Sequence, residues 1–171
     1  QTQRDLVQKL HATGKPVVMV LTTGSALAVD WAKQNLPAIL VAWYPGQRGG
    51  SAVADVLLGD ANPAGRLPVT FYKGDEKLPA FDDYDMQGRT YRYFTGEALY
   101  PFGHGLSYTS FGYDGLALQR GGNGVDDPIT VKMTLSNQGK HAGDEVVQLY
   151  LRPLSAKHAR ARKTLRGFQR V

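Results

Sequence analysis

The sequence predicts an α/β unit followed by a partial antiparallel β-sandwich. Two continuously apolar segments, 17–21 and 38–43, alternate with helical patterns at the spacing of parallel strand–helix–strand units. From residue 113 onward, apolar and polar residues alternate with the period of two that indicates half-buried strands. We therefore expect one domain over residues 1–94, a linker over 95–112 and a second, truncated domain over 113–171.

The first elements are separated by glycine and polar turn residues. The apolar spacing over residues 6–10 indicates the end of an amphipathic helix that Gly14 terminates. The run 17–21 is apolar at every position, which predicts a strand covered on both faces. A helix is expected over residues 26–34, with Ser25 as its N-cap.

The second predicted strand, 38–43, leads into a loop that can face a ligand. The strand stops at Pro45-Gly46, and the pair Gly49-Gly50 opens a helix for which Ser51 is the expected cap. The turn formers of residues 60–63 end this helix. Strand, loop and helix together predict one βα unit.

The middle of the chain changes character. Residues 67–71 are expected to form a short extended segment. From 73 to 111 the sequence is rich in acids, glycines and aromatic residues and has little periodicity. This composition is typical of a long functional loop or of an interdomain linker.

The last third predicts antiparallel strands at 129–135 and 145–151, joined by the turn signal 137–143. Residues 167–171 have the pattern of a strand that is just beginning. A complete sandwich takes about 100 residues, and only about 60 remain here, so we expect this domain to be truncated. Because the chain also begins at Gln-Thr-Gln-Arg, without an initiator methionine or a signal-peptide pattern, we expect an interior piece of a longer protein.

The net charge of +5 comes from one end of the chain. Residues 152–171 hold seven of the 20 Lys and Arg and none of the 15 acids, so the remainder has a balance of −2. We expect this tail to be a solvated loop and not a nucleic-acid-binding arm. Its basic residues are Arg152, Lys157, Arg160, Arg162, Lys163, Arg166 and Arg170.

Cysteine is absent, which excludes disulfides, thiolate metal sites and a cysteine nucleophile. No apolar stretch approaches the roughly 18 residues of a membrane helix, so no membrane partner is expected. The absence of cysteine does not fix the compartment, and we favour a periplasmic or secreted location over a cytoplasmic one.

Three local patterns suggest chemistry, and each has a simpler structural interpretation that we favour. The glycines of residues 46–50 before a helix suggest a phosphate site, but they match no nucleotide-binding motif, and a tight turn explains them. Ser25 lacks the Gly-x-Ser-x-Gly context of a nucleophile. Asp82, Asp83 and Asp85 suggest a glycosidase pair, but neighbouring residues of an extended loop point apart, which favours a solvated acidic loop.

No cofactor or metal is expected. The four histidines lack the spacing of metal ligands: they are His11, His104, His141 and His158.

The segments 88–94 and 99–108 are the richest in aromatic residues and arginine. Flat rings pack against the apolar faces of sugars and arginine donates hydrogen bonds to hydroxyls, so these segments are candidates for a carbohydrate contact. Packing between two domains explains the same composition, because the segments join two differently patterned halves. Both interpretations stay open.

Several motifs in order along the chain resemble the C-terminal part of glycoside hydrolase family 3. They are Leu21-Thr-Thr-Gly-Ser, Ala42-Trp-Tyr-Pro-Gly-Gln-x-Gly-Gly-Ser, Ala54-Asp-Val-Leu-Leu-Gly-Asp, Arg89-Thr-Tyr-Arg-Tyr-Phe, Leu99-Tyr-Pro-Phe-Gly-His-Gly and Ala142-Gly-Asp-Glu-Val-Val. The resemblance is closest to β-glucosidases and β-xylosidases. It implies a mainly parallel α/β sandwich domain followed by an immunoglobulin-like (fibronectin type III-like) domain.

The resemblance further implies a retaining, exo-acting hydrolase of oligosaccharides or aryl β-glycosides, with glucose or xylose left undecided. Its nucleophile is an aspartate of an N-terminal barrel domain and its acid/base a glutamate upstream of this segment, so no catalytic residue is assigned to this chain. The candidates for the substrate cleft are Trp43, Tyr44, Gln47 and Arg48 at a strand end, and Arg89, Tyr91, Arg92 and Tyr93 at the domain connection. The alternative is a non-catalytic module that binds glycan or protein.

Overall fold

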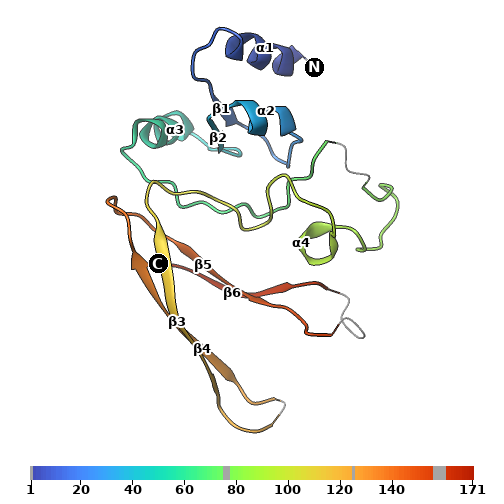
Figure 1. The fold of residues 1–171 in the computed structure, drawn as a ribbon. Coiled ribbons are helices and arrows are strands. Elements are labelled where there is room, and N and C mark those ends of the chain that lie inside the picture. The colour runs from blue at the N-terminus through green and yellow to red at the C-terminus, as the bar shows by residue number, and fades with distance from the viewer. Residues whose placement is uncertain (1, 75–77, 125, 156–160) are drawn as a thin grey trace.

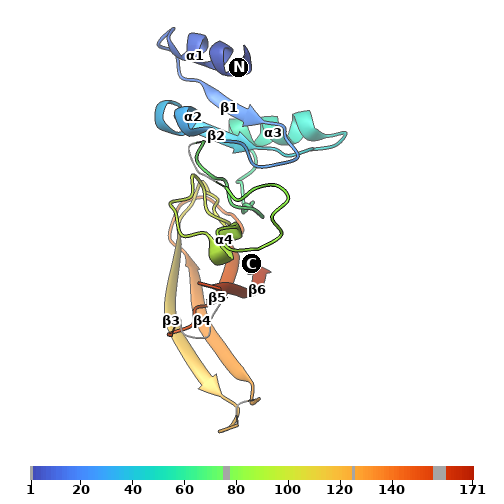
Figure 2. The same ribbon diagram turned by 90° about the vertical axis from the view of Figure 1, so that its right-hand side faces the viewer.

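The computed structural model describes residues 2–74, 78–124, 126–155 and 161–171. The molecule is elongated: an α/β unit lies at one end, a long irregular segment with one short helix lies in the middle, and two β-hairpin-like pairs form the other end (Figures 1 and 2). Gln1, Lys157, His158 and Arg160, named above, lie outside the described residues.

The α/β unit comprises α1 (Thr2–His11), β1 (Val18–Leu21), α2 (Asp30–Asn35), β2 (Ala38–Val41) and α3 (Gly49–Leu58). β1 and β2 pair in parallel, with Val18 opposite Ala38 and Leu21 opposite Val41, which confirms the predicted parallel pair. The expectation that the first strand is covered on both faces is wrong for this chain, because Val18 and Val20 are 46% and 37% exposed.

Both predicted serine caps are wrong. α2 begins at Asp30 and not at Ala26, and Ser25 instead takes part in a local turn in which its N–H donates to the Thr23 hydroxyl at 3.2 Å. α3 begins at Gly49, so Ser51 lies inside its first turn. The turn that Gly49 makes with Gly46 starts this helix without a side-chain cap.

The middle segment is held by an antiparallel bridge and not by a strand. Phe71 and Tyr100 exchange both backbone hydrogen bonds, and the expected extended segment 67–71 pairs in this way only at its last residue. Leu67 also exchanges backbone bonds with the turn at Gly103 and His104. The segment contains a helix that the sequence did not predict, α4 (Thr90–Tyr93).

The second half contains β3 (Phe111–Arg120), β4 (Ile129–Asn137), β5 (Val146–Leu151) and β6 (Thr164–Arg170). β3 pairs with β4 and β5 with β6, both antiparallel and each with one irregularity in register. The expectation of a solvated basic tail is wrong for residues 164–170, because they form β6. Within this strand, Arg170 pairs with Asp144 at 2.6 Å.

The best-buried apolar residues of the described chain are Ala32, Leu36, Phe71 and Leu99. Phe71 is fully buried and packs edge to face against Trp43 and Tyr100. The core therefore lies where the α/β unit meets the middle segment. None of the helices in the described ranges has the length and apolar character that crossing a membrane requires.

Candidate functional site

The strand-end group comprises Trp43, Tyr44, Gln47 and Arg48, the candidate residues that follow β2. The last three are exposed, and Tyr44 is 77% exposed. Gly49 begins α3 so close to Pro45 that any side chain at position 49 would collide with the proline ring. The turn that the sequence predicted is therefore tight, and it leaves its polar side chains in solvent.

Trp43 anchors this group to the core. Its ring packs edge to face against Phe71, with centroids 6.2 Å apart. Its φ of 52° lies in the left-handed region, which costs a non-glycine residue about 1–2 kcal/mol. Such conformations persist where packing fixes them, and they cluster at functional sites. Thr90, beside the second candidate group, has a φ of 56°.

The junction group comprises Arg89, Tyr91, Arg92 and Tyr93, on and next to α4. Tyr91 stacks on Phe102 with ring centroids 4.3 Å apart and meets the Tyr150 ring edge to face at 5.9 Å. Its hydroxyl also accepts a hydrogen bond from the backbone N–H of Leu165 at 3.1 Å. Tyr91 therefore joins the middle segment to both strands of the β5–β6 pair.

The two arginines of the junction group contact the protein itself, although the buried Arg92 Nε makes no hydrogen bond within the described structure. Arg89 donates to the carbonyls of Ala80, Asp83 and Asp85 at 2.6–3.1 Å, so it closes the loop before α4. The Arg92 guanidinium lies over the ring of Tyr93, 5.4 Å from its centroid. These contacts support the interpretation of this segment as packing between two parts of the chain.

Phe71 and Tyr72 lie between the two groups and link them indirectly. Trp43 contacts Phe71 from one side, and the Tyr72 hydroxyl accepts a hydrogen bond from Thr90 N–H at 2.7 Å. Of the hydrogen bonds and ring contacts made by the described residues, none joins the strand-end group to the junction group directly. The sequence predicted both groups, and the structure places them in different surroundings.

An ion pair that the sequence did not indicate also joins the middle segment to the second half of the chain. Arg66 contacts Glu145 at 2.5 Å, and both side chains are 11% exposed. Partial burial of Tyr113 and the nearby negative charge of Glu145 raise the pKa of the tyrosine, so β3 lies beside this ion pair. Arg66 and Glu145 are 79 residues apart in sequence, and no local pattern around either residue indicates its partner.

Asn62 and Gln148 hold the middle segment to the second half of the chain through side-chain hydrogen bonds. The Asn62 side chain donates to the Ala142 carbonyl at 2.9 Å and accepts from Ser107 and from Tyr108 N–H. Gln148 donates to the Gly103 carbonyl at 3.1 Å. Gly103 has a φ of 81°, and a side chain there would collide with Gln148. The turn signal at Asn62 was visible in the sequence, but its distant partners were not.

His104 lies at the same turn, stacked on Tyr100 with centroids 5.2 Å apart. Burial, with smaller contributions from the positive charges of Lys33 and Arg66, lowers the pKa of His104. The Lys33 ammonium lies over the Tyr100 ring, 4.8 Å from its centroid. It also donates a hydrogen bond to the Leu99 carbonyl at 2.6 Å. The neutral imidazole is thus favoured at this position.

Three carboxylates of the middle segment, Asp83, Asp85 and Glu97, accept hydrogen bonds from other groups of the protein. The Asp83 and Asp85 side chains accept from backbone N–H groups two residues ahead. Glu97 pairs with Lys73 at 2.7 Å, and that hydrogen bond lowers the pKa of the carboxyl. The described residues contain no group of three or more histidine and acidic side chains arranged to hold a metal ion.

Comparison with known proteins gives consistent matches. The family model "Glycosyl hydrolase family 3 C-terminal domain" matches residues 1–108. The whole chain is 47% identical to 19% of a xylan 1,4-beta-xylosidase of Xylanibacter ruminicola, and 40% identical to 24% of a periplasmic beta-glucosidase of Salmonella typhimurium. The chain therefore spans about a fifth to a quarter of the length of these relatives.

Solved structures agree with the sequence relatives. A β-glucosidase of Erythrobacter marinus is 44% identical, with a TM-score of 0.82 over 99% of this chain and 23% of that protein. A β-glucosidase of Streptomyces venezuelae, solved with D-glucose, is 32% identical, with a TM-score of 0.85 over 100% of this chain and 24% of that protein.

Proposed function

We propose that this chain, which belongs to glycosyl hydrolase family 3, forms one wall of the sugar-cleaving cavity of a longer β-glycosidase. In this proposal the longer enzyme is a retaining, exo-acting hydrolase that removes terminal β-D-glucosyl or β-D-xylosyl residues from oligosaccharides or aryl β-glycosides. The observation that carries the proposal is the similarity along the whole chain to proteins named β-xylosidase and β-glucosidase.

The two carboxylates that break the bond are proposed to lie outside residues 1–171, the nucleophile in an N-terminal barrel domain. Three of the described carboxylates support this, because Glu145 is paired with Arg66 and Asp83 and Asp85 hold backbone turns. A general acid needs a raised pKa, whereas the hydrogen bond from Lys73 lowers that of Glu97. These groups serve the fold and leave catalysis to other residues.

The strand-end group is proposed to face the substrate. It follows the carboxyl end of a parallel strand, where ligands of open α/β sheets bind. Tyr44, Gln47 and Arg48 are exposed, so each can contact a sugar, although the Tyr44 ring also lies against Gly24. The junction group then has a different role, which is to hold this unit against a second domain proposed to be fibronectin type III-like.

A chimera tests the proposal directly. In it, residues 1–171 replace the matching segment of the Xylanibacter ruminicola β-xylosidase, with which they share 47% identity. We expect the chimera to hydrolyse nitrophenyl β-xyloside or β-glucoside and the isolated 171-residue chain to hydrolyse neither. Turnover by the isolated chain that one of its own acid-to-amide substitutions abolishes would refute the proposal.

The alternative function, a non-catalytic glycan- or protein-binding module, gives the opposite result. It predicts a folded chimera without hydrolysis and retention of the isolated chain on a neutral glycan column. A periplasmic or secreted location is proposed together with the main function, since one relative is named a periplasmic beta-glucosidase. Fractionation of cells that express the longer protein checks that part.

A further inference from the structure

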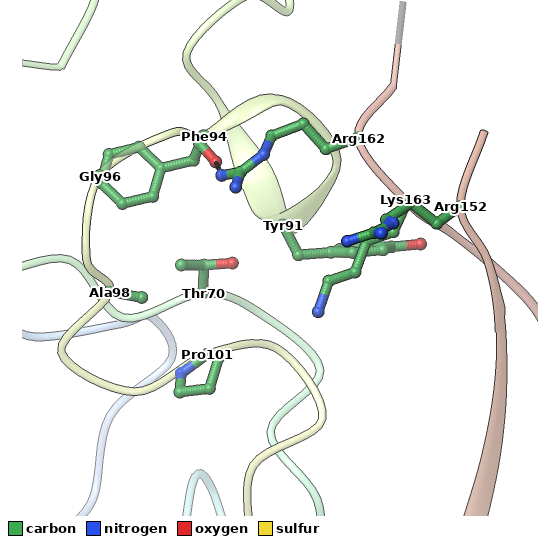
Figure 3. A pocket seen from close by; sticks show the side chains of 9 residues that line it. All are labelled: Thr70, Tyr91, Phe94, Gly96, Ala98, Pro101, Arg152, Arg162 and Lys163. Carbon is green, nitrogen blue, oxygen red and sulfur yellow. Dashed lines mark hydrogen bonds between the residues drawn. The ribbon is translucent and has the colours of Figure 1, made fainter. Parts of the chain in front are cut away.

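A hollow of about 310 Å³ opens between α4, the segment 94–101 and the β5–β6 pair. Figure 3 shows the side chains that line it converging from three parts of the chain. They are Thr70, Tyr91, Phe94, Gly96, Ala98, Pro101, Arg152, Arg162 and Lys163. The volume lies at the lower end of the range of small-molecule sites, which suits one sugar ring.

All charged side chains that line this hollow are positive. Arg152, Arg162 and Lys163 line it, and no acidic residue does. Among the described residues, no carboxylate forms an ion pair with any of the three. Three like charges around one cavity repel each other, and an anion placed between them removes that cost.

The three cations differ in how firmly they are held. Arg162 donates to the Phe94 carbonyl at 2.7 Å, which fixes its guanidinium at the rim and leaves further N–H groups to donate. Lys163 lies 4.9 Å from the centroid of the Tyr150 ring. Arg152 is exposed and has no hydrogen bond to the described residues, so it can turn toward a ligand. A planar guanidinium fork matches a carboxylate in particular.

A buried hydroxyl on the wall also lacks a partner. Thr70 is 7% exposed, and its Oγ1 makes no hydrogen bond within the described structure. Figure 3 shows this oxygen on the side of Thr70 that faces Tyr91 and Lys163. A buried unpaired hydroxyl is unfavourable, and a hydroxyl-bearing ligand beside it supplies the missing bond. Tyr91 and Phe94 add aromatic surface, against which sugar rings pack.

We infer that this hollow binds the carboxylate of an acidic sugar, with Arg152 and Arg162 on the carboxylate, Lys163 beside it and Thr70 toward a ring hydroxyl. The sugar part of this inference rests on the proposed function, whereas the anion part rests on the hollow alone. A carboxylate bound here would lie between α4 and the residues just before β6, so it would also connect the two halves of the chain.

Calorimetric titration with methyl β-D-glucuronide tests the site, with methyl β-D-glucoside and inorganic phosphate as the other arms. We expect the 171-residue chain to bind the glucuronide and not the glucoside, with an affinity that falls as salt is raised. Arg152→Gln should weaken binding about tenfold or more, as expected for loss of one charge-assisted hydrogen bond. Lys132→Gln, a charge-matched change on β4, should leave it unchanged.

The same titrations are made on the chimera, so a chain that fails to fold alone does not leave the question open. Equal binding of glucuronide and glucoside, or equal affinity in Arg152→Gln and the parent, overturns the site. Phosphate binding as tight as that of the glucuronide overturns the assignment to a sugar carboxylate. Hydrolysis of neutral nitrophenyl glycosides by the chimera reports on the proposed function separately, because these substrates carry no anion for the hollow.

Discussion

The strand-end group and the junction group have similar compositions, since both combine aromatic residues with arginine, yet their side chains have different surroundings. Tyr44, Gln47 and Arg48 are exposed to solvent at the end of β2. Tyr91, by contrast, contacts the rings of Phe102 and Tyr150 and the backbone N–H of Leu165, and Arg89 binds three carbonyls of the loop before α4. Composition alone therefore cannot separate residues that contact a ligand from residues that hold two parts of a protein together.

The difference also predicts what each group contributes. Removing a junction side chain leaves unpaired groups inside the protein, so its cost falls on stability. Removing the exposed side chain of Gln47 or Arg48 breaks no hydrogen bond or ring contact within the described structure, so its cost falls on whatever binds there.

The largest expected effect is at the buried ion pair. Arg66→Ala leaves Glu145 without its cation at a site where both side chains are 11% exposed, which should destabilise the junction by about 3–5 kcal/mol. Hydrogen exchange of the chimera, followed by mass spectrometry, should show faster exchange in peptides covering 62–72 and 99–108. Removing both partners, in Arg66→Ala/Glu145→Ala, should restore part of the protection, and unchanged exchange in the single variant would contradict the prediction.

The next effect is at the ring that joins the two halves. Tyr91→Ala removes the stack on Phe102, the edge contact with Tyr150 and the acceptor for Leu165 N–H, at a cost of about 2–4 kcal/mol. Tyr91→Phe retains both ring contacts and should cost only about 1 kcal/mol for the lost acceptor. Exchange of the β6 amides in the chimera measures both. Equal effects of the two variants would show that the rings contribute little.

The fold was predictable where neighbours in sequence carry the signal. The apolar runs and the glycines after them indicated β1, β2 and α3, and the period of two indicated the last strands. The cap positions were wrong because serine favours turns as well as N-caps, and the glycine turn at 46–49 starts α3 without one. The start of β6 at Thr164 was missed because the density of basic residues indicated a solvated tail, so a strand was expected only over residues 167–171.

The candidate site was predictable only as a list of residues. Motif and residue type indicated both groups, but the division between them depends on contacts across long stretches of sequence. The hydrogen bond between Arg162 and the Phe94 carbonyl and the pair of Arg66 with Glu145 each join residues more than 60 positions apart. Such pairs depend on how the halves meet, which no local periodicity encodes.

A smaller effect depends on pH at the His104 turn. Burial holds the pKa of His104 below its ordinary value of about 6.5, so the neutral form is favoured in the folded state. The stability from this group is complete above about pH 6.5 and is lost as pH falls from there toward the folded-state pKa. The urea midpoint of the 171-residue chain should therefore be lower at about pH 5 than at about pH 7.5. His104→Phe retains a ring on Tyr100 and should weaken this dependence, whereas an unchanged dependence would assign it to other groups.

The smallest expected effect on stability is in the strand-end group. There, unlike in the junction group, a substitution should change activity more than stability. Gln47→Ala and Arg48→Ala alter exposed side chains and should change stability by less than about 0.5 kcal/mol. In the chimera, however, either change should raise KM or lower kcat for a nitrophenyl glycoside severalfold, because these residues are proposed to contact the substrate. Lys132→Gln, an exposed change on β4, is the control that should alter neither quantity. Loss of stability without loss of activity in the Gln47 and Arg48 variants would assign this loop to the fold and remove the strand-end group from the proposed cavity.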